Sequence, residues 1–269
     1  MARSSLKNVL RLIDDAKNEV PVEKSFLQDL KRSIEMDADK DRRLPSLSYK
    51  PSSMNCIRNM YYQVTGHAQD DIKSNYTLVG ICNSGTDIHK RIQDAVLNMH
   101  NNGIDCEYVD VAKFVENRNL DYLKIVQRPE PENGLYETKL FYEDLKLSFL
   151  CDGIIRYKGK YYILELKTES NYKWQNRQDV DSKHYAQGTA YSIAFGLNEV
   201  IFIYITRDVL DMKAFMFKPT DEMKEELIDK IKTCESYVAE HSCPPKPNNL
   251  SRLTCEYCNY RDACNINAN

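Results

Sequence analysis

The first forty residues alternate apolar and charged positions at the spacing of amphipathic helices. The pattern predicts two such helices, over 4–18 and 22–39, interrupted around Pro21. A linker bounded by prolines follows at 45–51. We therefore expect residues 1–50 to form a helical extension and linker that either stays solvated or docks a protein partner.

Two further helices are expected before the chain becomes rich in strands. Ser52 or Ser53 can cap a short helix, because a serine side chain accepts hydrogen bonds from the free amides of a first turn. This helix carries Cys56, Arg58, Tyr61 and Tyr62. A longer helix over 77–102 has the following residues at helical spacing: Ile81, Gly85, Ile88, His89, Ile92 and Val96.

From about Leu120 the apolar pattern changes to a period of two, which is typical of strands. Strands are predicted at 121–127, 135–142, 146–157, 160–168, 199–206 and 211–217. Helices are predicted at 219–240 and at 178–196, the latter ending near Gly196. The chain therefore mixes helices and strands, and it contains no glycine-rich phosphate loop that would indicate an ATP-driven motor.

A tight hairpin organises the most informative segment. Lys158-Gly159 is predicted as a two-residue turn, because glycine readily adopts the positive φ that such turns require. If Tyr157 faces Lys160, then Asp152 and Glu165 lie directly across from one another on one face of the sheet. Lys167 follows two residues later and shares that face.

Two opposed carboxylates destabilise a sheet unless a partner neutralises them, and their oxygens suit a hard divalent cation. A symmetric turn centred on Glu143-Asp144 would pair Glu137 with Leu150 and bring a third acid to this face as an outer ligand. The sequence therefore predicts a metal site on the hairpin.

The alternative is a surface hairpin in which Arg156 and Lys167 form ordinary salt bridges with the two acids. The strand that leads to Glu165 is apolar on both faces, which places this acid at the rim of a buried sheet. An unpartnered charge is costly in such a position, so the pattern favours a functional site.

Two helix faces carry weaker indications of chemistry. His89 lies one turn after Gly85, where a glycine would let the helix backbone approach a sheet or ligand closely. Gln187 and Tyr191 are likewise one turn apart on a single face. Each pair alone is equally compatible with ordinary packing.

Composition adds further constraints. With 269 residues, 42% of them hydrophobic, the chain is long enough to bury a substantial core. Its longest apolar run, at 200–205, is too short to cross a bilayer, so we expect a cytoplasmic protein that does not bind membranes. A net charge of −3 argues against coating nucleic acid through bulk positive charge, but it is compatible with binding nucleic acid through a local group of cations.

Nine cysteines are many for a reducing compartment, where clustered thiols indicate metal ligation rather than disulfides. Cys255, Cys258 and Cys264 are close in sequence, and Cys56 is the best candidate for a fourth ligand. Four-thiolate zinc sites usually use two C-x2-C pairs, so this spacing fits an iron-sulfur cubane at least as well, with zinc as the alternative. Either group would join the segments 52–65 and 243–265.

In chain order, these motifs resemble those of the iron-sulfur branch of the RecB-like PD-(D/E)xK nucleases. That branch includes CRISPR-adaptation exonucleases, the nuclease domain of AddAB helicase-nucleases and phage-encoded relatives. The resemblance covers residues 52–265 and leaves 1–50 and 103–133 outside the family pattern. The residues that carry it are Cys56, Arg58, Gly85, His89, Glu137, Asp152, Glu165, Lys167, Gln187, Tyr191, Cys255, Cys258 and Cys264.

The resemblance implies an α/β (α+β), restriction-endonuclease-like domain over 51–269, with a central mixed sheet flanked by helices. It implies one or two Mg²⁺ or Mn²⁺ ions bound by His89, Asp152, Glu165 and the Leu166 carbonyl, with Glu137 outside them. Lys167 would orient or help deprotonate the attacking water, while Gln187 and Tyr191 would position the strand or that water. A [4Fe-4S] cluster would be held by Cys56, Cys255, Cys258 and Cys264.

Aromatic and basic residues beside the catalytic strand are candidates for DNA contacts, and they are Tyr172, Lys173, Trp174 and Arg177, together with Arg58. A packed anchor for the loop is the alternative interpretation of the aromatic pair. The leading hypothesis is a metal-dependent exonuclease acting on single-stranded DNA ends in recombination, replication or CRISPR-type processing, with internal cleavage left open. If the chain is phage-encoded, it would act in the host cytoplasm. The alternative is a cluster-stabilised DNA-end-binding subunit whose catalysis is dispensable.

Overall fold

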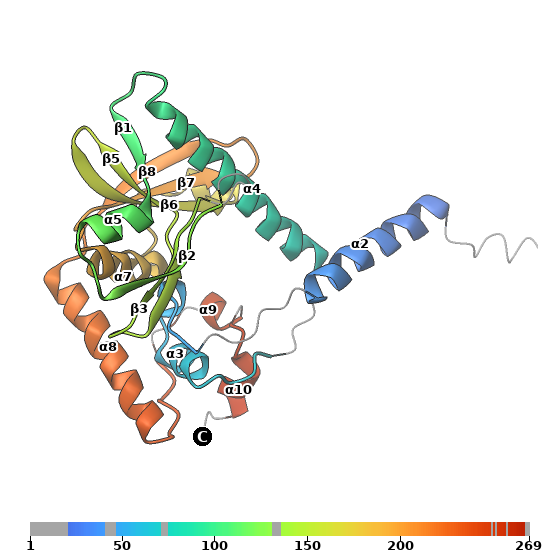
Figure 1. Ribbon diagram of the computed structural model, residues 1–269. Coiled ribbons are helices and arrows are strands. Elements are labelled where there is room, and N and C mark those ends of the chain that lie inside the picture. Colours follow the sequence, from blue (N-terminus) through green and yellow to red (C-terminus); the bar gives the residue numbers. More distant parts are fainter. Residues whose placement is uncertain are drawn as a thin grey trace, which may run out of the picture. The chain divides into compact units, whose positions relative to one another are not determined.

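A computed structural model describes residues 21–40, 47–70, 75–130, 136–248, 250, 252–256 and 258–266 (Figure 1). The helix predicted at 4–18 lies outside these residues. The chain divides into two compact units, one formed by 1–43 with 73–82 and the other by 44–72 with 83–269. Within the described part, none of the helices combines the length and the apolar character needed to cross a membrane.

The first unit contains helix α2 (Val22–Lys40) and the start of helix α4 (Tyr76–Met99). The prediction of a helix at 22–39 is confirmed. The Tyr76 amide donates a hydrogen bond to Glu35 Oε1 (3.0 Å), and the Lys31 ammonium lies 4.5 Å from the centre of the Tyr76 ring. Helix α2 buries none of its own residues within the described part of the chain.

A five-stranded sheet forms the centre of the second unit, in the order β1-β5-β6-β7-β8. Strands β6 and β7 run parallel and the other neighbours antiparallel, so the sheet is mixed, as predicted. β1 has no predicted counterpart, because four residues are too few to show an alternating pattern. The strands are β1 (Cys106–Val109), β5 (Gly153–Tyr157), β6 (Lys160–Glu169), β7 (Val200–Thr206) and β8 (Met212–Phe217).

A second sheet has three strands, β2 (Leu123–Gln127), β3 (Lys139–Tyr142) and β4 (Leu147–Leu150). The prediction of one continuous strand at 146–157 is therefore wrong. The chain leaves the small sheet after Leu150, passes through Cys151 and Asp152, and enters the large sheet at Gly153. Apolar and polar residues alternate in both β4 and β5, so the sequence pattern does not show that the chain passes from one sheet to the other.

The turn between β3 and β4 also differs from the prediction. It covers Glu143–Lys146 and pairs Tyr142 with Leu147, which places Lys139, rather than Glu137, opposite Leu150. Lys146 occupies the left-handed region (φ +48°), which closes this longer turn. The correct register is thus two residues from the predicted one, and the same face is preserved.

Helices cover both faces of the large sheet. Ile88 and Val96 of α4 pack against Leu164, Leu166 and Ile205 on one face. On the other face, α7 (Tyr185–Phe195) and α8 (Asp221–Ala239) pack against a larger core. α7 is almost wholly buried and ends at Gly196 (φ +63°), as predicted, but it begins at 185 rather than 178, after a short 3-10 turn, η3 (Ser182–His184).

The remaining elements are short. Among them are η1 (Pro51–Ser53), α3 (Ile57–Val64), α5 (Val111–Asn117), α6 (Asn171–Gln175), α9 (Arg252–Glu256) and α10 (Arg261–Ile266). The two serines expected to cap α3 instead lie in η1, and Cys56 occupies the N-cap position without a side-chain cap bond. The thiol is therefore not engaged in capping.

Candidate active site

The candidate site lies where β5 begins. Tyr157 pairs with Lys160 around a turn in which Gly159 has φ +77°, as predicted. Gly153 pairs with Leu164, so the predicted register of the hairpin is confirmed up to the step before Asp152 and Glu165.

Beyond Leu164, strand β6 has no strand partner on the β5 side in the described part of the chain. The Asp152 carboxylate occupies this opening and accepts a hydrogen bond from the Leu166 amide at Oδ2 (2.6 Å). In a strand, the N–H and C=O of one residue point to the same side. The Leu166 carbonyl therefore also faces the opening, where a metal ligand is predicted.

Asp152, His89 and Glu137 form a compact group of ligand atoms that all lie within 4.8 Å of one another. His89 Nδ1 is 3.4 Å from Asp152 Oδ1. Extending the observed β3–β4 register by two residues places Glu137 opposite Asp152, which explains why it reaches the group. Glu137 therefore belongs to the innermost set of potential ligands, whereas the sequence predicts an outer one.

Glu165 and Lys167 belong to a connected polar chain that reaches α7. Lys167 Nζ donates to Glu165 Oε1 (2.7 Å) and to Gln187 Oε1 (2.9 Å). Gln187 Nε2 donates to the same Glu165 oxygen (2.6 Å) and to the Tyr191 hydroxyl (2.9 Å), which donates to the Leu150 carbonyl (2.9 Å). The residues predicted from α7 thus orient Glu165 and Lys167.

The second oxygen of Glu165 carries the strongest indication of a missing ligand. Glu165 is 3% exposed, and its Oε2 has no hydrogen-bond donor among the described residues. A buried carboxyl oxygen without a partner is costly whether or not the acid is ionised. Carboxylate oxygens beside an imidazole are donors that Mg²⁺ and Mn²⁺ accept, so the residues present fit one or two divalent cations.

The electrostatics of the site reflect crowded acids. Burial, together with repulsion from Asp152, raises the pKa of Glu165 and of Glu137. Burial also acts on Asp152, but the hydrogen bond and charge of His89 outweigh it and lower the pKa of that acid. Burial lowers the pKa of Lys167, yet the neighbouring carboxylates raise it by more, so this lysine is charged at neutral pH.

Divalent cations are expected to stabilise the protein, and more strongly at pH 8 than at pH 6. Because the pKa values of Glu165 and Glu137 are raised, the metal-free fold retains protons that the unfolded chain releases, and it loses stability as pH rises through those values. A bound cation removes this penalty. At 100 times Kd the gain is about 2.7 kcal/mol, or roughly 5 to 10 °C in melting temperature with MnCl₂.

The matched control for this measurement is His89→Ala, which removes one predicted ligand. Its melting temperature should respond to MnCl₂ much less than that of the wild type. A wild-type shift that is absent, or equal at the two pH values, would contradict cation binding by these acids.

Gly85 allows α4 to approach the sheet at this point. A Cβ atom added there would lie 3.2 Å from Thr168 Oγ1, which is tighter than ordinary contact. This confirms the predicted close approach one turn before His89. The helix backbone therefore lies close to strand β6.

Two residues that were not predicted from the sequence bind the backbone of Asp152. Gln93 Nε2 (2.9 Å) and the Tyr108 hydroxyl both donate to the Asp152 carbonyl. Gln93 lies one turn after His89 and is 3% exposed. A polar residue on the apolar face of α4 is the feature of the sequence that could have pointed to its role. Tyr108 belongs to strand β1, which was not predicted, and no feature of the sequence pointed to its role.

The four cysteines predicted as ligands line one cavity. Cys56 precedes α3, and Cys255, Cys258 and Cys264 come from the C-terminal segment. Apart from the group at His89, no three potential metal ligands among the described residues lie within 4.8 Å of one another. Tetrahedral zinc with bonds of about 2.3 Å would hold its sulfurs about 3.8 Å apart. The sulfurs are thus more widely spread than a single zinc ion requires.

Hydrogen-bond donors point at these sulfurs. Asn59 Nδ2 lies 3.6 Å and the Tyr260 amide 3.5 Å from Cys258 Sγ, while Arg58 Nη1 lies 3.4 Å from Cys264 Sγ. Such donors stabilise thiolates and tune the potentials of iron-sulfur clusters. Both the cysteines and the donors around them are therefore compatible with a group bound through thiolates.

The structure corrects the prediction that Arg58 contacts DNA. Arg58 is 6% exposed and also donates to the carbonyls of Pro244 (2.6 Å) and Cys264 (2.9 Å). Its guanidinium ties α3 to the C-terminal segment, because burial requires each donor to find an acceptor.

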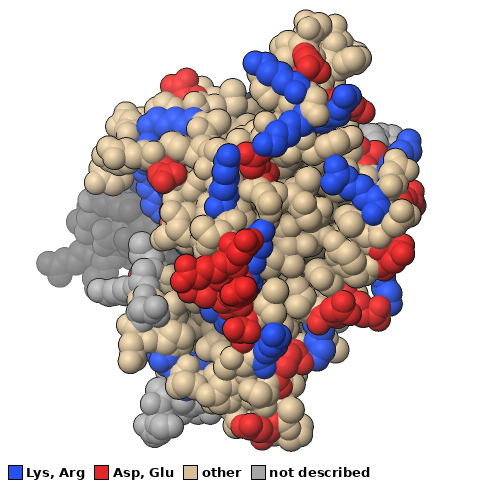
Figure 2. All heavy atoms as spheres, turned by 90° about the vertical axis from the view of Figure 1, so that its left-hand side faces the viewer, with Lys and Arg blue, Asp and Glu red and all other residues tan. Residues whose placement is uncertain are grey.

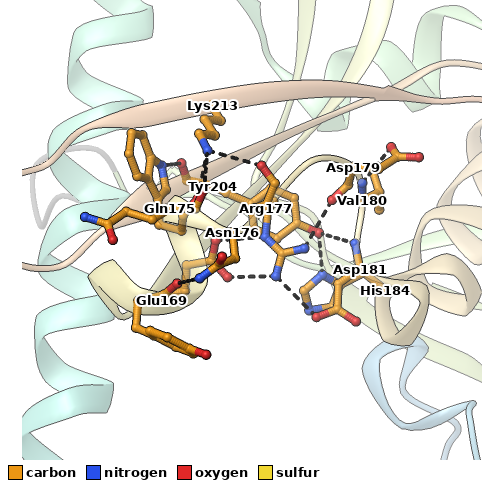
Figure 3. Close-up of polar contacts among 12 residues, drawn as sticks. Glu169, Gln175, Asn176, Arg177, Asp179, Val180, Asp181, His184, Tyr204 and Lys213 are labelled. Atoms are coloured by element: carbon orange, nitrogen blue, oxygen red, sulfur yellow. Dashed lines mark hydrogen bonds and ion pairs between the residues drawn. The ribbon is translucent and has the colours of Figure 1, made fainter.

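Two more of the residues predicted to contact DNA instead bind other parts of the protein. Arg177 forms a bidentate pair with Glu169 (2.8 Å to each oxygen), as Figure 3 shows. Trp174 Nε1 donates to the Tyr204 carbonyl (3.1 Å), so this ring is the packed anchor of the loop. Tyr172, at 78% exposed, and Lys173 remain at the surface and available to a ligand.

No protein-family model matches the chain, and no curated protein matches it significantly. A crystal structure of SSO0001 is similar over 88% of this chain and 96% of that chain, with 14% identity and a TM-score of 0.45.

Proposed function

We propose that this chain is a metal-dependent DNA nuclease of the PD-(D/E)xK type, acting on single-stranded DNA ends. One observation carries the proposal. Asp152, His89 and Glu137 form a compact ligand group beside Glu165, whose buried Oε2 has no donor among the described residues. A purely structural hairpin would leave that oxygen unpaired and the acids in mutual repulsion.

Bound Mg²⁺ or Mn²⁺ would supply a polarised water and offset the charge that builds on the phosphate. Lys167, whose pKa is raised by the neighbouring carboxylates, would orient or help deprotonate this water and stabilise the phosphate oxygens. Gln187 and Tyr191 fix the position of Lys167 and of one Glu165 oxygen. Water attack on phosphorus releases the alcohol of the neighbouring nucleotide.

The cysteine cavity supports a second part of the proposal, a [4Fe-4S] cluster. A cubane carries four irons between its thiolates and holds them farther apart than one zinc ion does. Cluster ligation would join α3 to the C-terminal segment across roughly two hundred residues of chain. The role we propose for it is to stabilise the domain.

The test is digestion of three single-stranded DNA substrates, labelled at the 5′ end, labelled at the 3′ end, or circular, with MgCl₂ or MnCl₂. We expect both linear substrates to be degraded and the circle to survive, with the first labelled product giving the polarity. Degradation of the circle would indicate internal cleavage. Binding of linear ends without any degradation would contradict the nuclease and support the end-binding subunit instead.

A further inference from the structure

A nuclease must hold the substrate backbone beside its metal site, yet this chain has a net charge of −3. On the face drawn in Figure 2, basic and acidic residues lie interspersed rather than gathered into one basic surface. Phosphate contacts therefore need a local group of cations.

Such a group surrounds a cavity next to Lys167. About 560 Å³ of empty space, partly open to solvent, is lined by Lys167, Lys173, Lys183, His184 and Arg207. Lys167 also belongs to the acid site, so the cavity adjoins the proposed chemistry directly. A strand held by the metal ligands has this cavity as its neighbour.

Two of the four lysine and arginine side chains that line this cavity are unpaired within the described chain. In the part of the chain that the structure describes, neither the Lys173 ammonium nor the Arg207 guanidinium has an ion-pair or hydrogen-bond partner. Lys183 has only a long contact with Asp181 (3.5 Å). The acid that lines the cavity, Glu169, is neutralised by Arg177. The cavity thus carries a net positive charge without a bound anion.

A set of hydrogen bonds and ion pairs supports the wall of the cavity, as Figure 3 shows. Lys213 Nζ donates to the carbonyls of Trp174 (2.9 Å), Gln175 (3.3 Å) and Arg177 (3.1 Å), which gathers the end of α6. The Arg177 guanidinium lies 4.0 Å from the centre of the Tyr204 ring. The short helix that carries Lys173 is therefore anchored at its C-terminal end.

His184 adds a neutral donor. The Tyr204 hydroxyl accepts from the Asp181 amide (3.0 Å) and lies 2.8 Å from His184 Nδ1. The buried hydroxyl needs an acceptor for its own proton, which assigns Nδ1 as that acceptor and leaves the proton of the imidazole on Nε2. Burial lowers the pKa of His184 to about 3, in keeping with a neutral ring.

We propose that this cavity is an anion subsite that holds a phosphate of the substrate strand, with Lys173 and Arg207 as its principal cationic contacts. The strand then runs from the metal-site acids, past Lys167, to the loop that carries α6. This inference rests on the proposed nuclease function for the identity of its ligand. The phosphate is either the terminal one of a 5′-phosphorylated end or an internal diester.

The test measures binding without cleavage. Fluorescence anisotropy would follow 3′-labelled oligothymidylate, with a 5′-phosphate or a 5′-hydroxyl, in CaCl₂ and at several salt concentrations. For Lys173→Gln/Arg207→Gln we expect Kd to rise at least about 10-fold and the salt dependence to weaken by roughly one phosphate contact. The control Lys113→Gln/Lys232→Gln removes the same charge from side chains that are each 72% exposed.

Loss confined to the 5′-phosphorylated strand would place the terminal phosphate in the cavity, and equal loss for both strands would place an internal one. A double variant that binds like the control would overturn the inference, as would a wild type that binds neither strand. Wild-type binding that depends on Lys173 and Arg207, without degradation in MnCl₂, would contradict the nuclease and leave the subsite standing.

Discussion

Asp152→Asn and Lys167→Ala are each expected to lower the rate of manganese-dependent degradation of labelled single-stranded DNA by at least about 100-fold. Asparagine preserves the shape of Asp152 and its contact with the Leu166 amide, but it removes the charge that a cation needs. Alanine at 167 removes the ammonium that bridges Glu165 and Gln187. The measurement is the initial rate at saturating MnCl₂.

Lys113→Ala is the matched control, because this lysine is 72% exposed and lies on α5, away from the candidate site. It should retain the wild-type rate. Circular dichroism and melting temperature should show all three variants folded, since both site variants leave the sheet register intact. Wild-type activity in either Asp152→Asn or Lys167→Ala would refute the assigned site.

The β5–β6 hairpin of this site was predictable because a single local feature, its turn, determines the register. A two-residue turn leaves no freedom of register, so Lys158-Gly159 alone fixes the pairing up to Gly153 and Leu164, the neighbours of Asp152 and Glu165. The longer turn after Tyr142 lacks such a constraint, and the prediction for Glu137 missed its register by two residues. Register is predictable from sequence where the turn is tight and has a glycine at the strained position.

What could not be predicted depends on contacts between distant segments. Arg58 has the charge of a DNA ligand, and only the fold shows that its guanidinium is buried against the C-terminal segment. Tyr108 supports Asp152 because β1 pairs with β5, which no local pattern reveals. Both cases show that charge or ring type alone does not distinguish a ligand contact from an internal one.

The cysteine cavity leads to the second large expected effect. Protein purified without oxygen should be brown, with a broad absorption at roughly 400 nm from thiolate-to-iron charge transfer. Cys258→Ala should lose this colour and melt at least about 10 °C lower, because the group that joins α3 to the C-terminal segment is lost together with its binding free energy. Absorption spectra, iron and zinc analysis and thermal unfolding measure these effects.

Cys82→Ala is the matched control, since Cys82 is exposed and does not line the cavity. It should keep the colour, the iron content and the melting temperature. Colourless protein with one zinc per chain would contradict the cubane. A Cys258→Ala variant as stable as the control would show that the four thiols do not share a ligand, because a group bound only in the folded state must stabilise that state.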